Sequence, residues 1–164
     1  MYLLDPALNA LVSQALGMYQ DKAGPVKTLA LAADAVSVAI PEDYLGVAVA
    51  LDAEGRWHEV DIVGEDLVVT EETNSVKPYK ITYFVNMREM DIEEGVLPFE
   101  SITVLTDYLY VLISIPNTQR TREVAAATGM QVEIPGDADL DQRKSLLEHS
   151  MEDCQSIIPM ATVY

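Results

Sequence analysis

The chain has 164 residues, 49% of them apolar, which fits one domain that can bury a core without disulfides or metals. Its single cysteine excludes an internal disulfide, and one cysteine with two histidines excludes a Cys/His zinc site. A net charge of −17, from 27 acidic and 10 basic residues, argues against binding nucleic acid or an anionic membrane.

Residues 1–24 are predicted to contain an N-terminal helix. Asp5-Pro6 suits its start, and Gly24-Pro25 suits its end. Between them, apolar residues recur at helical spacing: Leu8, Leu11, Val12, Ala15, Leu16 and Tyr19. No basic region precedes an apolar run, so we expect no signal peptide. No stretch is apolar for the roughly 20 residues that span a bilayer, and we therefore expect a protein assembled in cytoplasm.

Residues 26–90 are predicted to form a β insert. Short alternating segments cover 29–31, 36–40, 47–51, 56–63, 67–70 and 79–87, with turn residues between them. Turns every 8–12 residues are typical of a small antiparallel sandwich or open barrel.

Residues 97–158 are predicted to be helical again. Leu97-Pro98 begins a helix with an apolar face formed by Ile102, Leu105, Leu109, Leu112 and Ile113. Pro116 is expected to kink or break this helix, which resumes and ends at Gly129. Asp137 or Asp139 caps a last helix, whose stripe is Leu140, Leu147, Met151, Cys154 and Ile158. Pro159 ends it and leaves a tail over 159–164.

The predicted fold is therefore α+β: one domain in which a helical bundle, made of the N-terminal and C-terminal helices, carries an inserted antiparallel β-sandwich or small open barrel. An isolated first helix would not be stable by itself, so it should pack against the C-terminal helices.

No catalytic, cofactor-binding or metal-binding residue is predicted. The sequence has no nucleophile elbow, phosphate loop, dinucleotide fingerprint or HExxH motif. His58 is interpreted as a surface strand residue, His149 as an exposed or interfacial helix residue, and Cys154 as a buried small hydrophobe. Asp137, Asp139 and Asp141 resemble the start of a calcium loop, but a helix cap and first-turn acids explain them.

Several short motifs together resemble the head-to-tail adaptor (tail tubular protein A-like) family of tailed phages. Residues 36–45 read as an apolar strand followed by Pro41, two acids, Tyr44 and Leu45. The strand at 80–85 is followed by an acidic connector and then by Leu97-Pro98-Phe99 opening a long helix. A second helical run, 120–128, and an acidic helix, 140–156, complete the pattern.

The resemblance implies a structural virion protein in the virion neck, with no enzymatic activity and no cofactor. It implies a ring, commonly of twelve copies, docked under the portal protein and opening to a downstream tail or nozzle protein. DNA would pass through the lumen without sequence-specific binding, and acidic walls would repel its phosphates. Candidate lumen or surface acids are Glu93, Glu94, Asp141, Glu148 and Glu152.

The apolar tail is the predicted partner-docking segment, through Ile157, Ile158, Met160, Val163 and Tyr164. An apolar tail suits insertion into a neighbouring subunit or the portal, and packing back on its own bundle is the alternative. Two further hypotheses remain open: a small acidic inhibitor that mimics DNA and binds a DNA-binding protein, and an unassigned enzyme or binding domain.

Overall fold

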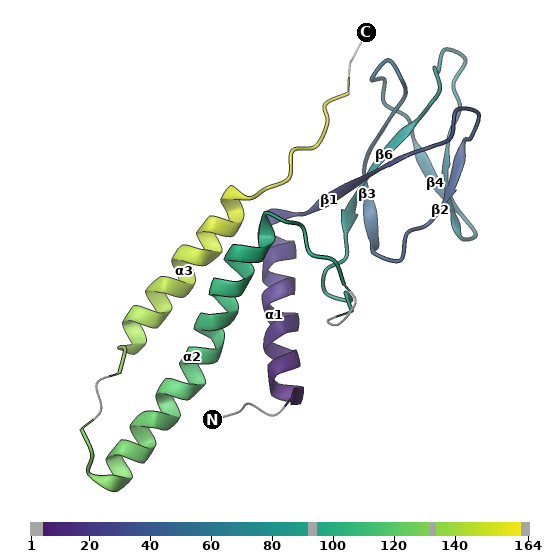
Figure 1. Ribbon diagram of the computed structural model, residues 1–164. Coiled ribbons are helices and arrows are strands. Elements are labelled where there is room, and N and C mark those ends of the chain that lie inside the picture. Colours follow the sequence, from purple (N-terminus) through teal and green to yellow (C-terminus); the bar gives the residue numbers. More distant parts are fainter. Residues whose placement is uncertain (1–4, 92–94, 132–133, 162–164) are drawn as a thin grey trace. The chain divides into compact units, whose positions relative to one another are not determined.

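The computed structural model describes residues 5–91, 95–131 and 134–161, and its fold is α+β (Figure 1). Three helices and six strands follow one another as α1 (Asp5–Ala23), β1 (Val26–Ala30), β2 (Ser37–Ala39), β3 (Tyr44–Leu51), β4 (Val60–Val63), β5 (Asp66–Val69), β6 (Lys80–Val85), α2 (Ser101–Thr128) and α3 (Asp137–Asp153). The chain divides into two compact units. The helical unit comprises Met1–Ala23 and Arg88–Gln155, and the β unit comprises Gly24–Met87 and Ser156–Tyr164.

In the helical unit all three helices pack against one another, and α2 runs opposite to α1 and α3 (Figure 1). Helix α1 buries one face against α2 and α3, and small and aromatic residues of that face form part of the core of the helical unit. The buried residues are Ala15, Leu16, Tyr19 and Ala23 of α1, Val104, Leu105, Tyr108, Val111 and Leu112 of α2, and Leu140 and Met151 of α3. The first helix thus packs on the C-terminal helices, as predicted.

The buried face of α2 differs from the predicted one. Leu105 and Leu112 are buried as expected, but Ile102 is 46% exposed and Leu109 is only half-buried. At about 100° per residue, the observed face lies roughly a quarter turn from the predicted one. The reason is that α2 carries apolar residues on more than one face, and the Tyr108 ring sits in the core.

Pro116, which was expected to kink or break α2, does not break it. The helix continues from Ser101 to Thr128 and ends at Gly129, whose φ of 69° is the left-handed conformation that favours glycine. The Pro116 side chain is exposed, so its ring displaces no core residue. The two predicted helices are therefore one.

The last helix ends earlier than predicted, at Asp153 instead of near Ile158. Glu148, Glu152 and Asp153 place negative charge near its carboxyl end, which opposes the helix dipole. At the other end Gly136 is the N-cap in place of Asp137 or Asp139. Asp139 instead accepts a hydrogen bond from the Gly136 N–H at 3.2 Å.

The β unit contains two three-stranded antiparallel sheets, with strand orders β1-β6-β3 and β2-β5-β4. One buried cluster contains residues from both: Leu31, Ala50, Leu67, Val69, Tyr79 and Ile81. The strand predicted over 56–63 is shorter, since only Val60–Val63 is a strand and Trp57 forms an isolated bridge with Leu51. A tight turn around Asp52 occupies the residues before it.

No described helix is both long enough and apolar enough to cross a membrane.

Candidate interaction surfaces

The predicted docking tail begins where α3 ends. Ile157 is 92% exposed, Met160 is 90% exposed and Ile158 is 39% exposed. Val163 and Tyr164 lie outside the described residues. The exposed side chains of Ile157 and Met160 are apolar area that a partner could cover.

The acids predicted to face a lumen or the surface fall into different settings. Asp141 is exposed on α3, whereas Glu93 and Glu94 lie outside the described residues. Glu148 is half-buried and accepts a hydrogen bond from the Tyr108 hydroxyl at 2.8 Å. Glu152 pairs with Lys22 of α1 at 2.6 Å and with His149 at 3.1 Å. Glu148 and Glu152 therefore connect the three helices to one another.

These contacts shift the pKa values of Tyr108, Glu152 and Lys22. Burial and the Glu148 carboxylate raise the pKa of Tyr108 well above its usual range. The hydrogen bond from Lys22 lowers the pKa of Glu152, with His149 adding to the effect, and the same pair raises the pKa of Lys22. Tyr108, Glu152 and Lys22 thus keep their ordinary charge states at neutral pH.

His58, interpreted from the sequence as a surface residue, is buried and only 2% exposed. Its Nε2 lies 3.5 Å from an Asp52 carboxylate oxygen, which is long for a hydrogen bond, and its ring meets Tyr79 edge-on with centroids 5.2 Å apart. The turn before β4 folds the ring inward, which period-2 alternation could not reveal. A histidine this buried offers no surface to a substrate.

Asp52 stabilises that turn. Its carboxylate accepts the backbone N–H groups of Glu54 and Arg56 at 2.9 Å and that of Val76 at 3.1 Å. Burial by itself would raise the pKa of Asp52, but these N–H donors and His58 lower it overall. Gly55 completes the turn with a φ of 81°.

The segment of Pro41, two acids, Tyr44 and Leu45 has a clear structural role in the β unit. Asp43 accepts hydrogen bonds from the Tyr83 hydroxyl at 2.9 Å and from Lys27 at 2.5 Å, and Tyr44 packs on the Tyr83 ring. Burial and Asp43 raise the pKa of Tyr83 to about 12. The motif therefore fixes the β2–β3 turn to β6.

A groove that the sequence analysis missed runs along the second half of α2, beside α3. It consists of two adjoining hollows, of about 390 and 410 Å³, that share Asn117 and Thr121. Its apolar lining includes Tyr110, Ile113, Val124, Ile134, Pro135 and Leu140, and we call it the α2–α3 groove. The signal was present in the sequence: Tyr110, Ile113 and Val124 share a helix face opposite the buried one.

Among the described residues that line the α2–α3 groove, every charged one is basic. They are Arg120 and Arg143, and the Arg143 guanidinium lies 5.7 Å from the centre of the Tyr110 ring. Basic charge concentrated on an apolar groove is unusual in a chain with 27 acidic residues.

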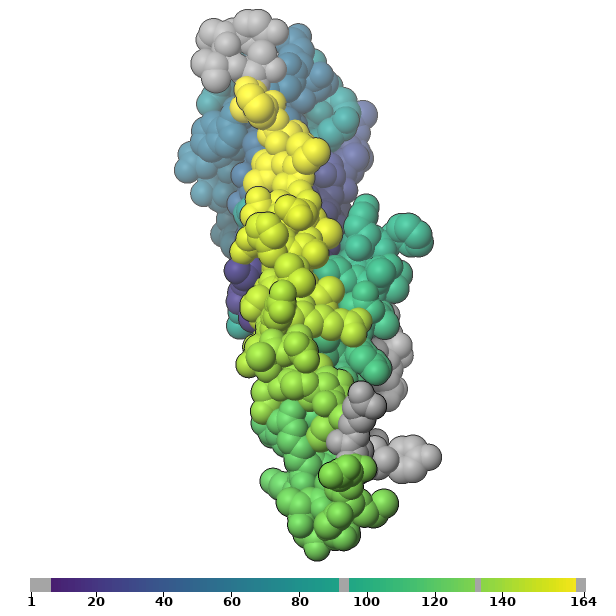
Figure 2. Space-filling view, turned by 90° about the vertical axis from the view of Figure 1, so that its left-hand side faces the viewer, coloured from purple at the N-terminus to yellow at the C-terminus, as the bar shows by residue number. Residues whose placement is uncertain are grey.

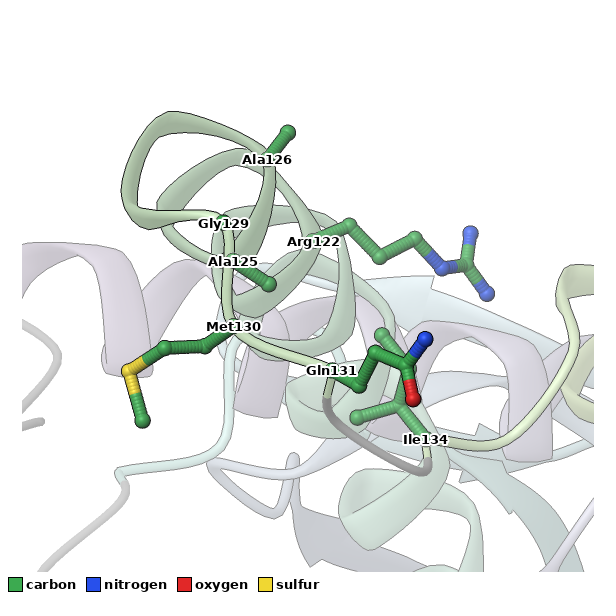
Figure 3. A pocket seen from close by; sticks show the side chains of 7 residues that line it. All are labelled: Arg122, Ala125, Ala126, Gly129, Met130, Gln131 and Ile134. Carbon is green, nitrogen blue, oxygen red and sulfur yellow. The ribbon is translucent and has the colours of Figure 1, made fainter.

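The hollow at the α2–α3 turn does not have the geometry of a ligand site. In Figure 3 the Met130 side chain points away from Arg122 and Gln131, and Ala126 points outward, so the lining side chains do not converge. Arg122 is engaged elsewhere, with the Asp137 carboxylate and the Pro135 carbonyl. Nor do the described residues contain a group of three or more His, Cys, Asp or Glu that could hold a metal ion.

No protein-family model matches the chain, and a search of curated proteins finds no match.

Proposed function

We propose that the chain is a structural assembly protein: a phage head-to-tail adaptor that forms a ring under the portal and lines part of the DNA-conducting channel. The observation that carries the proposal is the apolar segment after α3, in which Ile157 and Met160 are about nine-tenths exposed. Such a segment is suited to insertion into a neighbouring protein. The proposed role is non-enzymatic and needs no cofactor.

The order of the elements supports the same proposal. A helix, an inserted β unit, two further helices and an extended tail follow one another in the order that the resemblance to the adaptor family implies. In its finer form we propose a three-helix bundle carrying a β-sandwich. The ring would contain about twelve copies, as the resemblance implies, between the portal and a downstream tail or nozzle protein in the virion neck.

The acidic surface is consistent with a channel wall. A net charge of −17 repels phosphates over a range of about 8 Å at physiological salt, so DNA would pass without adhering. Asp141 is the exposed candidate for such a wall, because Glu148 is hydrogen-bonded to Tyr108 of α2 and Glu152 is paired with Lys22 of α1.

The test is the mass of the purified protein by light scattering, with negative-stain images of the protein alone and mixed with a portal protein. Rings, alone or on the portal, are the expected result. A monomer that ignores the portal would overturn the proposal. If that monomer bound a purified DNA-binding protein in competition with duplex DNA, the DNA-mimic function would replace it.

The tail has its own test. Deleting residues 157–164 should abolish docking on the portal or on neighbouring copies while leaving the circular dichroism spectrum unchanged, since Ile157 and Met160 are exposed. The double variant Ile157→Asp/Met160→Asp should behave like the deletion, and Ile157→Leu/Met160→Leu should keep assembly because it keeps apolar area. Normal docking by the aspartate variant would remove the tail from the proposal.

A further inference from the structure

Two surfaces on different units of this chain have complementary chemistry. One is the α2–α3 groove, with Arg120 and Arg143 on an apolar floor. The other is the β4–β5 hairpin, residues 60–69, whose strands pair directly with Ile62 opposite Leu67 and Val63 opposite Asp66.

The basic residues of the groove lack acidic partners within the described part of the chain. Seven of the ten Lys and Arg residues form an ion pair with an Asp or Glu. The three that do not, among the described residues, are Lys80, Arg120 and Arg143, and two of these line the groove. The chain has 27 acidic residues, yet neither arginine pairs with a described one, and both lie near the exposed side chains of Tyr110 and Val124. This combination indicates a surface that binds another molecule.

The hairpin has the opposite character. Ile62 is 58% exposed and Val63 is 61% exposed, and β4 is an edge strand of its sheet. Glu65 and Asp66 at the tip are exposed and form no ion pair with a described residue. A hairpin tip that joins two exposed aliphatic side chains to unpaired carboxylates has the composition that an apolar groove with two arginines would bind.

We propose that the β4–β5 hairpin of one copy docks in the α2–α3 groove of the next, an inference that names the subunit contact of the proposed assembly and rests on that function. Ile62 and Val63 cover the floor at Ile113 and Val124, and the Glu65 and Asp66 carboxylates accept hydrogen bonds from Arg120 and Arg143. Figure 2 shows the helical unit from the side of α3, with the α2–α3 turn at its lower end (green).

Hairpin and groove are different surfaces of the same chain, so the contact can repeat head to tail. Each copy has one hairpin and one groove, and head-to-tail repetition of the contact gives a ring when the rotation closes. A two-fold dimer in which each hairpin docks in the groove of the other copy would use the same two surfaces, and the mass of the assembly distinguishes it from a ring. Bidentate pairing of arginine with carboxylate also fixes the orientation of the docked hairpin.

Two charge-reversed variants test the contact. In the groove variant, Arg120→Glu/Arg143→Glu, an acidic groove faces the native acidic hairpin. In the hairpin variant, Glu65→Lys/Asp66→Lys, a basic hairpin faces the native basic groove. Each should lose self-association alone, whereas an equimolar mixture should regain the wild-type mass by light scattering, because every contact in the mixture again joins opposite charges.

Matched controls separate this effect from a general change in net charge. Lys80→Glu alters an exposed base outside the groove, and Glu42→Lys/Glu72→Lys alters two exposed acids outside the hairpin. Both should keep the wild-type mass. An unchanged circular dichroism spectrum is expected for all variants, since each replaced side chain is exposed.

The outcomes distinguish this inference from the proposed function. If the wild type forms rings and both charge-reversed variants do so too, the inference is overturned and the adaptor proposal stands. Variants that lose association and stay monomeric when mixed also overturn it. A wild type that stays monomeric and ignores the portal overturns both. A labelled single-stranded DNA that binds the wild type but not the groove variant would assign the groove to nucleic acid instead.

Discussion

At the scale of single residues, the buried polar groups of the β unit are in two opposite situations. The Asp52 carboxylate is 4% exposed and accepts three backbone N–H groups, so its charge is stabilised. The Tyr79 hydroxyl and both His58 ring nitrogens are buried without a hydrogen-bond partner among the described residues. Removing the Asp52 carboxylate should therefore lower the free energy of unfolding, whereas removing the unpaired Tyr79 hydroxyl should not.

Replacing Asp52 with asparagine should destabilise the protein by about 1–3 kcal/mol, because the turn loses charge-assisted acceptors. The stability that Asp52 contributes comes from a lowered folded-state pKa. It is therefore fully present above the unfolded value of about 3.9 and is lost as pH falls through the lower folded value. Urea unfolding between pH 7 and pH 3 should show less acid sensitivity in the variant, with exposed Glu59→Gln as the control. Equal acid sensitivity in wild type and variant would contradict this role.

Replacing Tyr79 with phenylalanine should raise the free energy of unfolding by about 1 kcal/mol, since the change removes an unpaired buried hydroxyl and keeps the ring against His58. Tyr83→Phe is the matched control. It should lose about 1.5–3 kcal/mol, because the Tyr83 hydroxyl donates to the Asp43 carboxylate. Thermal unfolding measures both. A loss of stability in Tyr79→Phe would indicate that this hydroxyl has a partner such as a buried water.

At the scale of elements, α2 is apolar on two faces and only one of them is buried in its own chain. Tyr108, Val111 and Leu112 face α1 and α3, while Ile102, Tyr110 and Val124 are exposed. A 28-residue helix with this distribution can pack on its own neighbours and still offer an apolar stripe to another chain.

Truncation to alanine should lower the free energy of unfolding by different amounts on the two faces of α2. Leu112→Ala should destabilise by about 2–5 kcal/mol, because Leu112 is 5% exposed and its loss leaves a cavity. Ile102→Ala should change stability by only about 0.5 kcal/mol, the usual size for a surface position. Urea unfolding of the two variants measures the difference. Equal costs would show that the buried face is misassigned.

At the scale of the whole molecule, the dominant quantity is a net charge of −17. Self-repulsion of this size opposes the compact state. The ion pairs that counter it, such as Lys22 with Glu152 and Arg88 with Asp21, are largely solvent-accessible, and such pairs contribute about 0–1 kcal/mol each.

Raising the salt concentration should therefore stabilise the fold. Between about 0.01 and 0.15 M salt the Debye length falls from about 30 to about 8 Å, which screens the repulsion more than it weakens short ion pairs. The urea midpoint should rise over this range at constant protein concentration. Sodium and potassium chloride should act alike if screening is the cause. A falling midpoint would show that the ion pairs outweigh the repulsion.

The sequence by itself determined the α+β class and the positions of α1 and most strands. These follow from local periods, from Gly24 and Gly129 at helix ends, and from turn residues such as Gly55, none of which depends on distant contacts. Tertiary structure alone decided which face of α2 is buried, that Pro116 is tolerated, that His58 lies inside, and that Arg120 and Arg143 share a groove. Each depends on which surfaces meet: a helix with two apolar faces is locally ambiguous, and only packing against α1 and α3 chooses between them.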